Sequence, residues 1–121
     1  MSRNQLECTA AGTFPAGTPI DLIDVSSLLP EVLPTGGLMV NITTHADSTF
    51  SADTPLAIGW AGAAGALIAS TDGLTAAGLN AGDWGKIPTT FAAPTADQTL
   101  AVTATSETTG TIHVNIYYNT F

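Results

Sequence analysis

The two histidines, His45 and His113, are the residues best suited to acid–base or metal chemistry. Each lies on the polar side of a segment in which apolar and polar residues alternate, so the two side chains can meet if the segments pair. An acid–base pair assisted by Lys86 is conceivable. A histidine metal site in the interior of a jelly-roll fold needs about three imidazoles and a carboxylate. The pattern of this sequence does not supply them. We interpret both as surface or interface histidines that make ordinary hydrogen bonds.

A polar loop, HADSTFSAD (45–53), carries Asp47, Ser48, Ser51 and Asp53. A calcium loop requires several oxygen ligands at fixed spacing and a glycine turn, and this segment has neither. We interpret it as a solvated loop after a strand, in which Asp and Ser side chains cap backbone groups.

Four large aromatic residues have polar tips: Trp60, Trp84, Tyr117 and Tyr118. Trp60 ends an apolar strand and Tyr118 is in phase with Ile116, so both are predicted to lie in the core. Trp84, in a glycine-rich loop, and Tyr117, on a polar face, are the exposed candidates. Exposed aromatic side chains can stack on sugars, but two residues favour packing or protein contact over a sugar site.

No pattern indicates an enzyme. There is no G-x-S-x-G motif, and the single cysteine, Cys8, has no base near it in the sequence. The glycine-rich segment GWAGAAG (59–65) follows no phosphate-binding pattern and leads into no helix. We therefore predict no catalytic, cofactor-binding or metal-ligating residues.

The charge of the chain excludes two classes of partner. The chain has ten acidic residues and only two basic ones, Arg3 and Lys86, which gives a net charge of −8. Two cations cannot neutralise a run of phosphates or hold an anionic membrane surface. No stretch approaches 18 apolar residues, and the start of the chain lacks the apolar region of a secretory signal, so we expect folding in a cytoplasm.

Apolar and polar residues alternate with a period of two along most of the chain. The firmest predicted strands are 38–46, 99–106 and the closing segment TIHVNIYYNTF. Further candidate strands are 6–12, 18–25, 55–60, 65–70 and 86–92. Helical periodicity is nearly absent: residues 25–34 allow one turn, and residues 71–84 are predicted as a long loop rather than a helical turn because of their three glycines.

About eight short strands in one chain of 121 residues predict a single all-β domain. The expected architecture is an antiparallel β-sandwich over residues 1–121, in the form of an eight-stranded jelly roll. The closing strand has the most regular alternation, so it is expected in the middle of a sheet. In the segment IDLIDV (20–25) the apolar phase slips after Leu22, which suggests a bulge or a strand covered on both sides.

Only 10% of the residues are charged, and Thr, Ser, Ala, Gly and Asn are abundant. Such short side chains lose little rotamer entropy when a partner immobilises them, and few long charges keep molecules apart. The surface therefore favours protein–protein contact, including contact between copies of this chain.

Three segments carry a resemblance of pattern over most of the chain: ECTAAGTFPAGTPIDL, LMVNITTHADSTFS and TLAVTATSETTGTIHVNIYYN. The chain resembles the small jelly-roll capsid decoration or cement proteins of tailed bacteriophages. This resemblance implies two four-stranded sheets, a homotrimer and a major capsid protein as partner. It further implies assembly in the host cytoplasm, a place on the exterior of the virion, and no catalytic residues.

The resemblance also directs attention to particular surfaces. Residues 1–12 could form an N-terminal arm that clamps a neighbour. The candidates for protein contact are the segment 71–85 and four residues in particular, Trp84, His113, Asn115 and Tyr117. A threefold axis could gather three copies of one Asp or His around an ion, a question that the sequence leaves open.

The alternative from a different class is a carbohydrate-binding or receptor-binding β-sandwich module of a phage fibre or bacterial surface protein. It would use Trp84 as a stacking platform, and a sugar would then be the partner.

Overall fold

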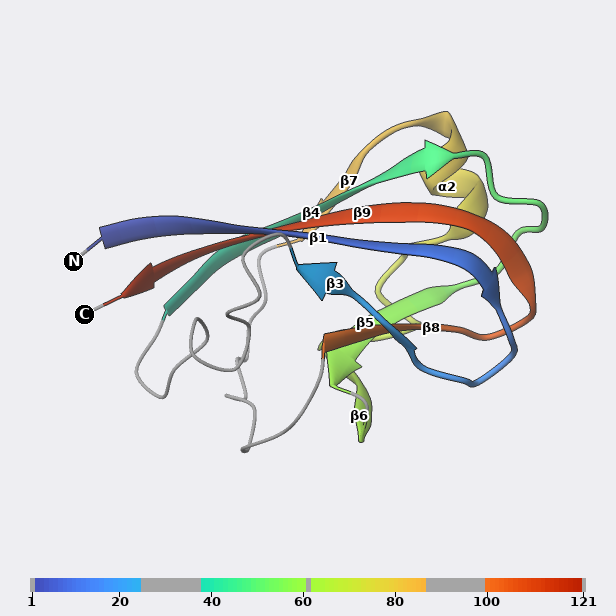
Figure 1. Ribbon diagram of the computed structural model, residues 1–121, viewed down its shortest axis with the longest axis horizontal. Coiled ribbons are helices and arrows are strands. Elements are labelled where there is room, and N and C mark those ends of the chain that lie inside the picture. Colours follow the sequence, from blue (N-terminus) through green and yellow to red (C-terminus); the bar gives the residue numbers. More distant parts are fainter. Residues whose placement is uncertain (1, 25–37, 61, 87–99, 121) are drawn as a thin grey trace.

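The computed structural model describes residues 2–24, 38–60, 62–86 and 100–120, which form two antiparallel sheets packed face to face (Figure 1). The elements are β1 (Ser2–Phe14), β2 (Ile20–Asp21), β3 (Ile23–Asp24), β4 (Leu38–Ser48), β5 (Leu56–Trp60), β6 (Ala63–Ile68), α2 (Ala76–Ala81), β7 (Trp84–Lys86), β8 (Leu100–Ala104) and β9 (Thr108–Thr120). The prediction of an all-β sandwich is confirmed at this level. The helical turn predicted at 25–34 and most of the strand predicted at 86–92 lie outside the described residues.

The five-stranded sheet has the order β3-β1-β9-β4-β7, and the four-stranded sheet has the order β2-β8-β5-β6. Strand β9 therefore lies in the middle of its sheet, as its regular alternation predicted. It pairs with β1 from Ser2 opposite Thr120 to Phe14 opposite Thr108. The long ribbon of β1, β9 and β4 brings both chain ends to one end of the molecule (Figure 1).

Alternation along β9 divides its side chains between core and surface. Ile112, Val114 and Ile116 are fully buried, whereas the residues between them are only half-buried. Burying such a side chain stabilises the fold by about 1.5–3 kcal/mol. Phe14 and Phe50 close one end of the core with their rings 6.0 Å apart.

The segment 20–25 changes sheets at Leu22. Ile20 pairs with Val102 in the four-stranded sheet, and Ile23 pairs with Thr9 in the five-stranded sheet. Leu22 itself is buried and donates its N–H to the carbonyl of Leu100. The phase slip after Leu22 thus marks a crossing between the two layers rather than a bulge within one strand.

Residues 2–12, considered above as a terminal arm, belong to β1 in the single chain. Leu6, Cys8 and Ala10 point into the core from this strand. The N-terminal segment is therefore part of the sandwich as well as a surface strand.

The prediction of a loop over 71–84 is wrong for residues 76–81, which form the helix α2. Thr75 caps the helix by accepting a hydrogen bond from the Gly78 N–H, and Asp53 accepts another from the Ala77 N–H. Ala76 and Leu79 anchor the helix in the core. Capping and burial outweigh the cost of the internal glycine, which is about 1 kcal/mol relative to alanine. Among the described residues no helix is long and apolar enough to cross a membrane.

Asp72 joins the turn after β6 to strand β7. Its carboxylate accepts a hydrogen bond of 2.8 Å from the Ala69 N–H and forms an ion pair with Lys86. The hydrogen bond from Lys86, followed by that from Ala69, lowers the pKa of Asp72 below its ordinary value. Deprotonated Asp72 therefore stabilises the folded state.

We expect Asp72→Asn to lower the free energy of unfolding near pH 7 by less than about 1 kcal/mol, because the pair is partly exposed. A depressed folded-state pKa contributes stability above the ordinary carboxyl pKa, and this contribution disappears as the pH falls through the folded value. The difference between wild type and variant should therefore shrink below about pH 4. Urea unfolding at several pH values measures it, and Lys86→Met should show the same trend. A difference that stays constant with pH would contradict this account.

Gly59 lies at a close approach between the backbones of β5 and β6. A Cβ atom at this position would lie 2.3 Å from the carbonyl oxygen of Ala63, and backbone cannot move aside as a flexible side chain can. We expect Gly59→Ala to destabilise the protein by about 1–3 kcal/mol. Thermal unfolding tests this, with Gly82→Ala as the matched control because nothing lies within 4 Å of its added Cβ atom. Equal stability of the two variants would refute the close approach.

Candidate functional site

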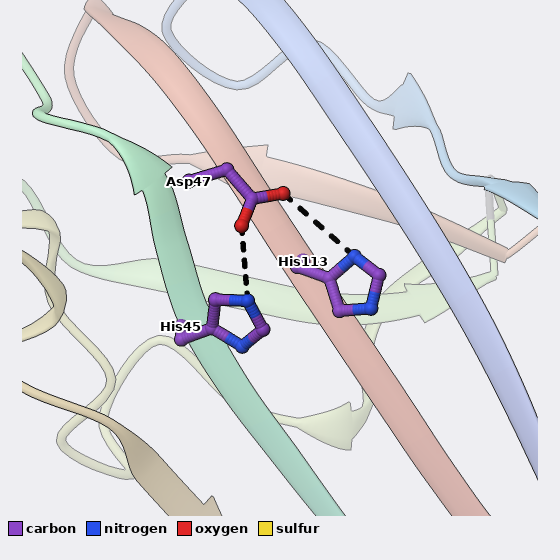
Figure 2. A group of neighbouring side chains, drawn as sticks. All are labelled: His45, Asp47 and His113. Carbon is purple, nitrogen blue, oxygen red and sulfur yellow. Dashed lines mark ion pairs between the residues drawn. The ribbon is translucent and has the colours of Figure 1, made fainter.

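His45, Asp47 and His113 form a cluster on the side of the five-stranded sheet that faces away from the core (Figure 2). Strand β4 supplies His45 and Asp47, and β9 supplies His113. The two histidines are directly opposite each other in the ladder, with ring centroids 4.8 Å apart and ring planes inclined by 34°. The two segments pair, and the two histidine side chains meet as the alternation allowed.

The carboxylate of Asp47 reaches both rings. Its Oδ1 lies 3.0 Å from His45 Nε2, and its Oδ2 lies 3.8 Å from His113 Nδ1. The hydroxyl of Thr9, on β1, lies 3.0 Å from the same Nδ1. One carboxylate, two imidazoles and one hydroxyl from three neighbouring strands therefore converge.

A bulge in β4 places Asp47 between the two rings. Ala46 pairs with Ile112 and Ser48 pairs with Thr111, so Asp47 is an extra residue with no counterpart on β9. A bulge bends its strand and redirects a side chain, here towards the adjacent strand. The side chains of Asp47, His45 and His113 are 45%, 38% and 19% exposed, which keeps the cluster accessible from solvent.

This arrangement suits proton exchange or binding of a cation, since imidazole nitrogens and carboxylate oxygens serve both. Lys86, considered above as an assistant to the histidines, forms its ion pair with Asp72 instead. Among the described residues, the cluster therefore consists of the two histidines and the carboxylate.

Three of the four predicted contact residues share this side of the sheet. We call it the outward face and define it by its described side chains: Gln5, Glu7, Thr9, Ala11, Thr13, Asn41, Thr43, His45, Asp47, Thr109, Thr111, His113, Asn115 and Tyr117. Asn115 accepts a hydrogen bond of 3.2 Å from Gln5, and the hydroxyls of Thr13 and Thr109 are 3.2 Å apart. These cross-strand contacts restrict the polar side chains before any partner arrives.

Trp84, the fourth predicted contact residue, lies on the opposite side of the sheet. It pairs with the buried Thr44, is itself half-buried and packs against the core. Trp84 and Tyr117 therefore lie on opposite sides of the sheet and cannot stack together on one sugar. Trp60 is buried, as predicted, and the side chain of Tyr118 lies outside the described residues.

The loop after β4 uses its polar side chains mainly to cap backbone groups, as predicted. Ser51 accepts a hydrogen bond of 3.0 Å from the Thr109 N–H, and Asp53 accepts one of 3.1 Å from Ala77. Asp47 departs from this role, because it turns to the histidines.

A shallow hollow of about 360 Å³ lies on the four-stranded sheet. Its lining consists of small residues without titratable groups: Gly17, Ala57, Ala64, Gly65, Ala69, Ser70, Thr103, Ala104 and Thr105. Thr103 Oγ1 is buried there without a hydrogen-bond partner. The hollow is concave, but it has few polar groups that could orient a ligand.

Sequence reasoning considered the histidines and Asp47 separately and missed the cluster. One signal was available, since His45 and Asp47 are two residues apart and such residues share a side of a regular strand. The pairing of His45 with His113 depends on the register between strands far apart in the sequence.

No protein-family model and no curated protein matches the chain. Among solved structures, it is similar to a chain of the "Cyanophage Pam1 capsid asymmetric unit". The similarity covers 99% of this chain and 86% of that chain, with a TM-score of 0.65 and 14% sequence identity. The two chains share a fold, and the resemblance to phage capsid proteins is supported at that level.

Proposed function

We propose that the chain is a structural protein of a bacteriophage virion, and specifically a capsid decoration or cement protein. In this proposal it forms a homotrimer, binds a major capsid protein on the exterior of the shell and stabilises the lattice after assembly in the host cytoplasm. The observation that carries the proposal is the fold shared with the cyanophage capsid chain over nearly the whole length of this one.

The order of the strands supports a jelly roll as the form of this fold. When the two-residue strand β3 is set aside, the sheets become β1-β9-β4-β7 and β2-β8-β5-β6. In each sheet a strand from the beginning of the chain pairs with one from its end, and two strands from its middle follow, which is the order expected when two Greek keys form the two four-stranded sheets of a jelly roll.

The outward face supports a role in assembly. Most of its side chains are short or aromatic, and the cross-strand hydrogen bond from Gln5 to Asn115 restricts one of the longer ones. A partner that binds such a face immobilises few flexible side chains, so association costs less conformational entropy. Tyr117, half-buried near the end of the central strand β9, is an aromatic anchor of the kind that contributes most to binding.

We further propose that the protein is not an enzyme. Its one cluster of imidazole and carboxylate groups among the described residues lies on an open sheet face, where water competes with a substrate. The small-residue hollow on the other sheet lacks titratable groups. Both features are more typical of a protein-contact surface than of an enzyme active site.

The oligomeric state is the first test. Multi-angle light scattering after size exclusion, at several protein concentrations, should give a mass of three times 12.2 kDa. A strict monomer at all concentrations would overturn the homotrimer, and shell binding would then have to be tested for a monomer.

Substitutions on the outward face test where assembly contacts lie. Asn115→Arg and Tyr117→Glu should abolish trimer formation or co-sedimentation with shells of the major capsid protein, because each buries a new charge at the interface. Circular dichroism should show an unchanged fold. Thr105→Arg, at an exposed position between β8 and β9, is the control that adds a charge elsewhere. Normal assembly of both outward-face variants would refute the surface assignment.

A further inference from the structure

The cluster of His45, Asp47 and His113 has the composition and spacing of a metal site. We propose that these three side chains bind one divalent transition-metal ion, with Zn²⁺ as the ion used to test it. The inference concerns the isolated chain and does not depend on the virion role.

The distances between the ligand atoms are close to those that zinc requires. Zinc lies about 2.0–2.1 Å from imidazole nitrogen and carboxylate oxygen, so two ligands at the tetrahedral angle are about 3.3 Å apart. Asp47 Oδ1 is 3.0 Å from His45 Nε2, and Asp47 Oδ2 is 3.8 Å from His113 Nδ1. All three ligand atoms lie within 4.8 Å of one another, so small rotations of the side chains bring them around one ion.

The kinds of ligand decide which metal is preferred. Calcium and magnesium take oxygen ligands, whereas imidazole suits zinc, copper and nickel. Two imidazoles and one carboxylate therefore favour Zn²⁺ and similar ions over Ca²⁺. This distinguishes the site from the calcium loop considered for residues 45–53.

The backbone holds the three side chains in place before an ion binds. His45 and His113 are opposite each other on paired strands, and the bulge at Asp47 turns the carboxylate towards them. The hydroxyl of Thr9, now 3.0 Å from His113 Nδ1, would release that nitrogen to the ion and remain available to the carboxylate or to a bound water. Such neighbouring hydrogen-bond partners orient metal ligands and tune their affinity.

Three protein ligands leave at least one coordination position open towards solvent, because the side chain of Asp47 is 45% exposed. On the outward face this position is available to water or to a donor group from a second molecule. The ion would then share this face with Asn115 and Tyr117, which are two and four residues along β9 from His113.

Isothermal titration of untagged, metal-free protein with ZnCl₂ tests the proposal. We expect one ion per chain, no comparable binding of CaCl₂ or MgCl₂, and weaker binding at acid pH because protons compete for the same nitrogens. His45→Gln, His113→Gln and Asp47→Asn should each lower the affinity at least about tenfold. Asp21→Asn, which removes an exposed carboxylate from β2 in the other sheet, should bind like wild type.

A second measurement locates the ion without any substitution. Addition of Zn²⁺ should shift the imidazole signals of both histidines in the NMR spectrum of the wild-type protein. Absence of zinc binding, or binding that His45→Gln and His113→Gln leave unchanged, would overturn the proposal. Because these readouts use the isolated chain, their failure is distinguishable from a failure to bind capsid shells.

Discussion

The pairing of β9 between β1 and β4 is the constraint on which the rest of the structure depends. Strand β9 contacts β1 over its whole length, and its inward residues Ile112, Val114 and Ile116 form the middle of the core. Because side chains alternate across a strand, the same pairing decides which residues remain on the outward face. A slip of one residue would bury His113 and Asn115 and expose the isoleucines, so the hydrophobic core holds the surface in register as well.

The surface chemistry follows from this register and from one departure from it. Regular pairing places His45 opposite His113, and the bulge in β4 adds Asp47 between them. Without the bulge, the same register would pair Asp47 with Thr111, two residues from His113 on β9. The candidate metal cluster and the proposed assembly face therefore share one origin, the ladder of central strands with its bulge at Asp47.

Polar side chains near the ends of the strands, among them the buried Thr54 and Thr108, hold the connecting loops in place. Asn80 of α2 accepts a hydrogen bond from the Phe50 N–H and donates one to the Phe50 carbonyl oxygen. The Thr108 hydroxyl accepts a hydrogen bond from the Ala52 N–H and donates one to the Ala52 carbonyl oxygen. The Thr54 hydroxyl accepts a hydrogen bond from the Ser106 N–H. These contacts satisfy backbone groups of the loops without a further strand. A scaffold held in this way suits a protein whose proposed role is to present a rigid face to a lattice.

Alternation in the sequence by itself determined the class of fold, the three strands predicted at 38–46, 99–106 and the closing segment TIHVNIYYNTF, and which side of each strand is buried, because a period of two is a local property of extended backbone. It also placed His113, Asn115 and Tyr117 together on one polar side. Tertiary structure alone decided the change of sheet at Leu22, the helix at 76–81 and the inward side of Trp84. It also decided the meeting of His45, Asp47 and His113. Each of these depends on which distant strand lies alongside, and contacts between residues far apart in the chain leave no periodic trace in a single sequence.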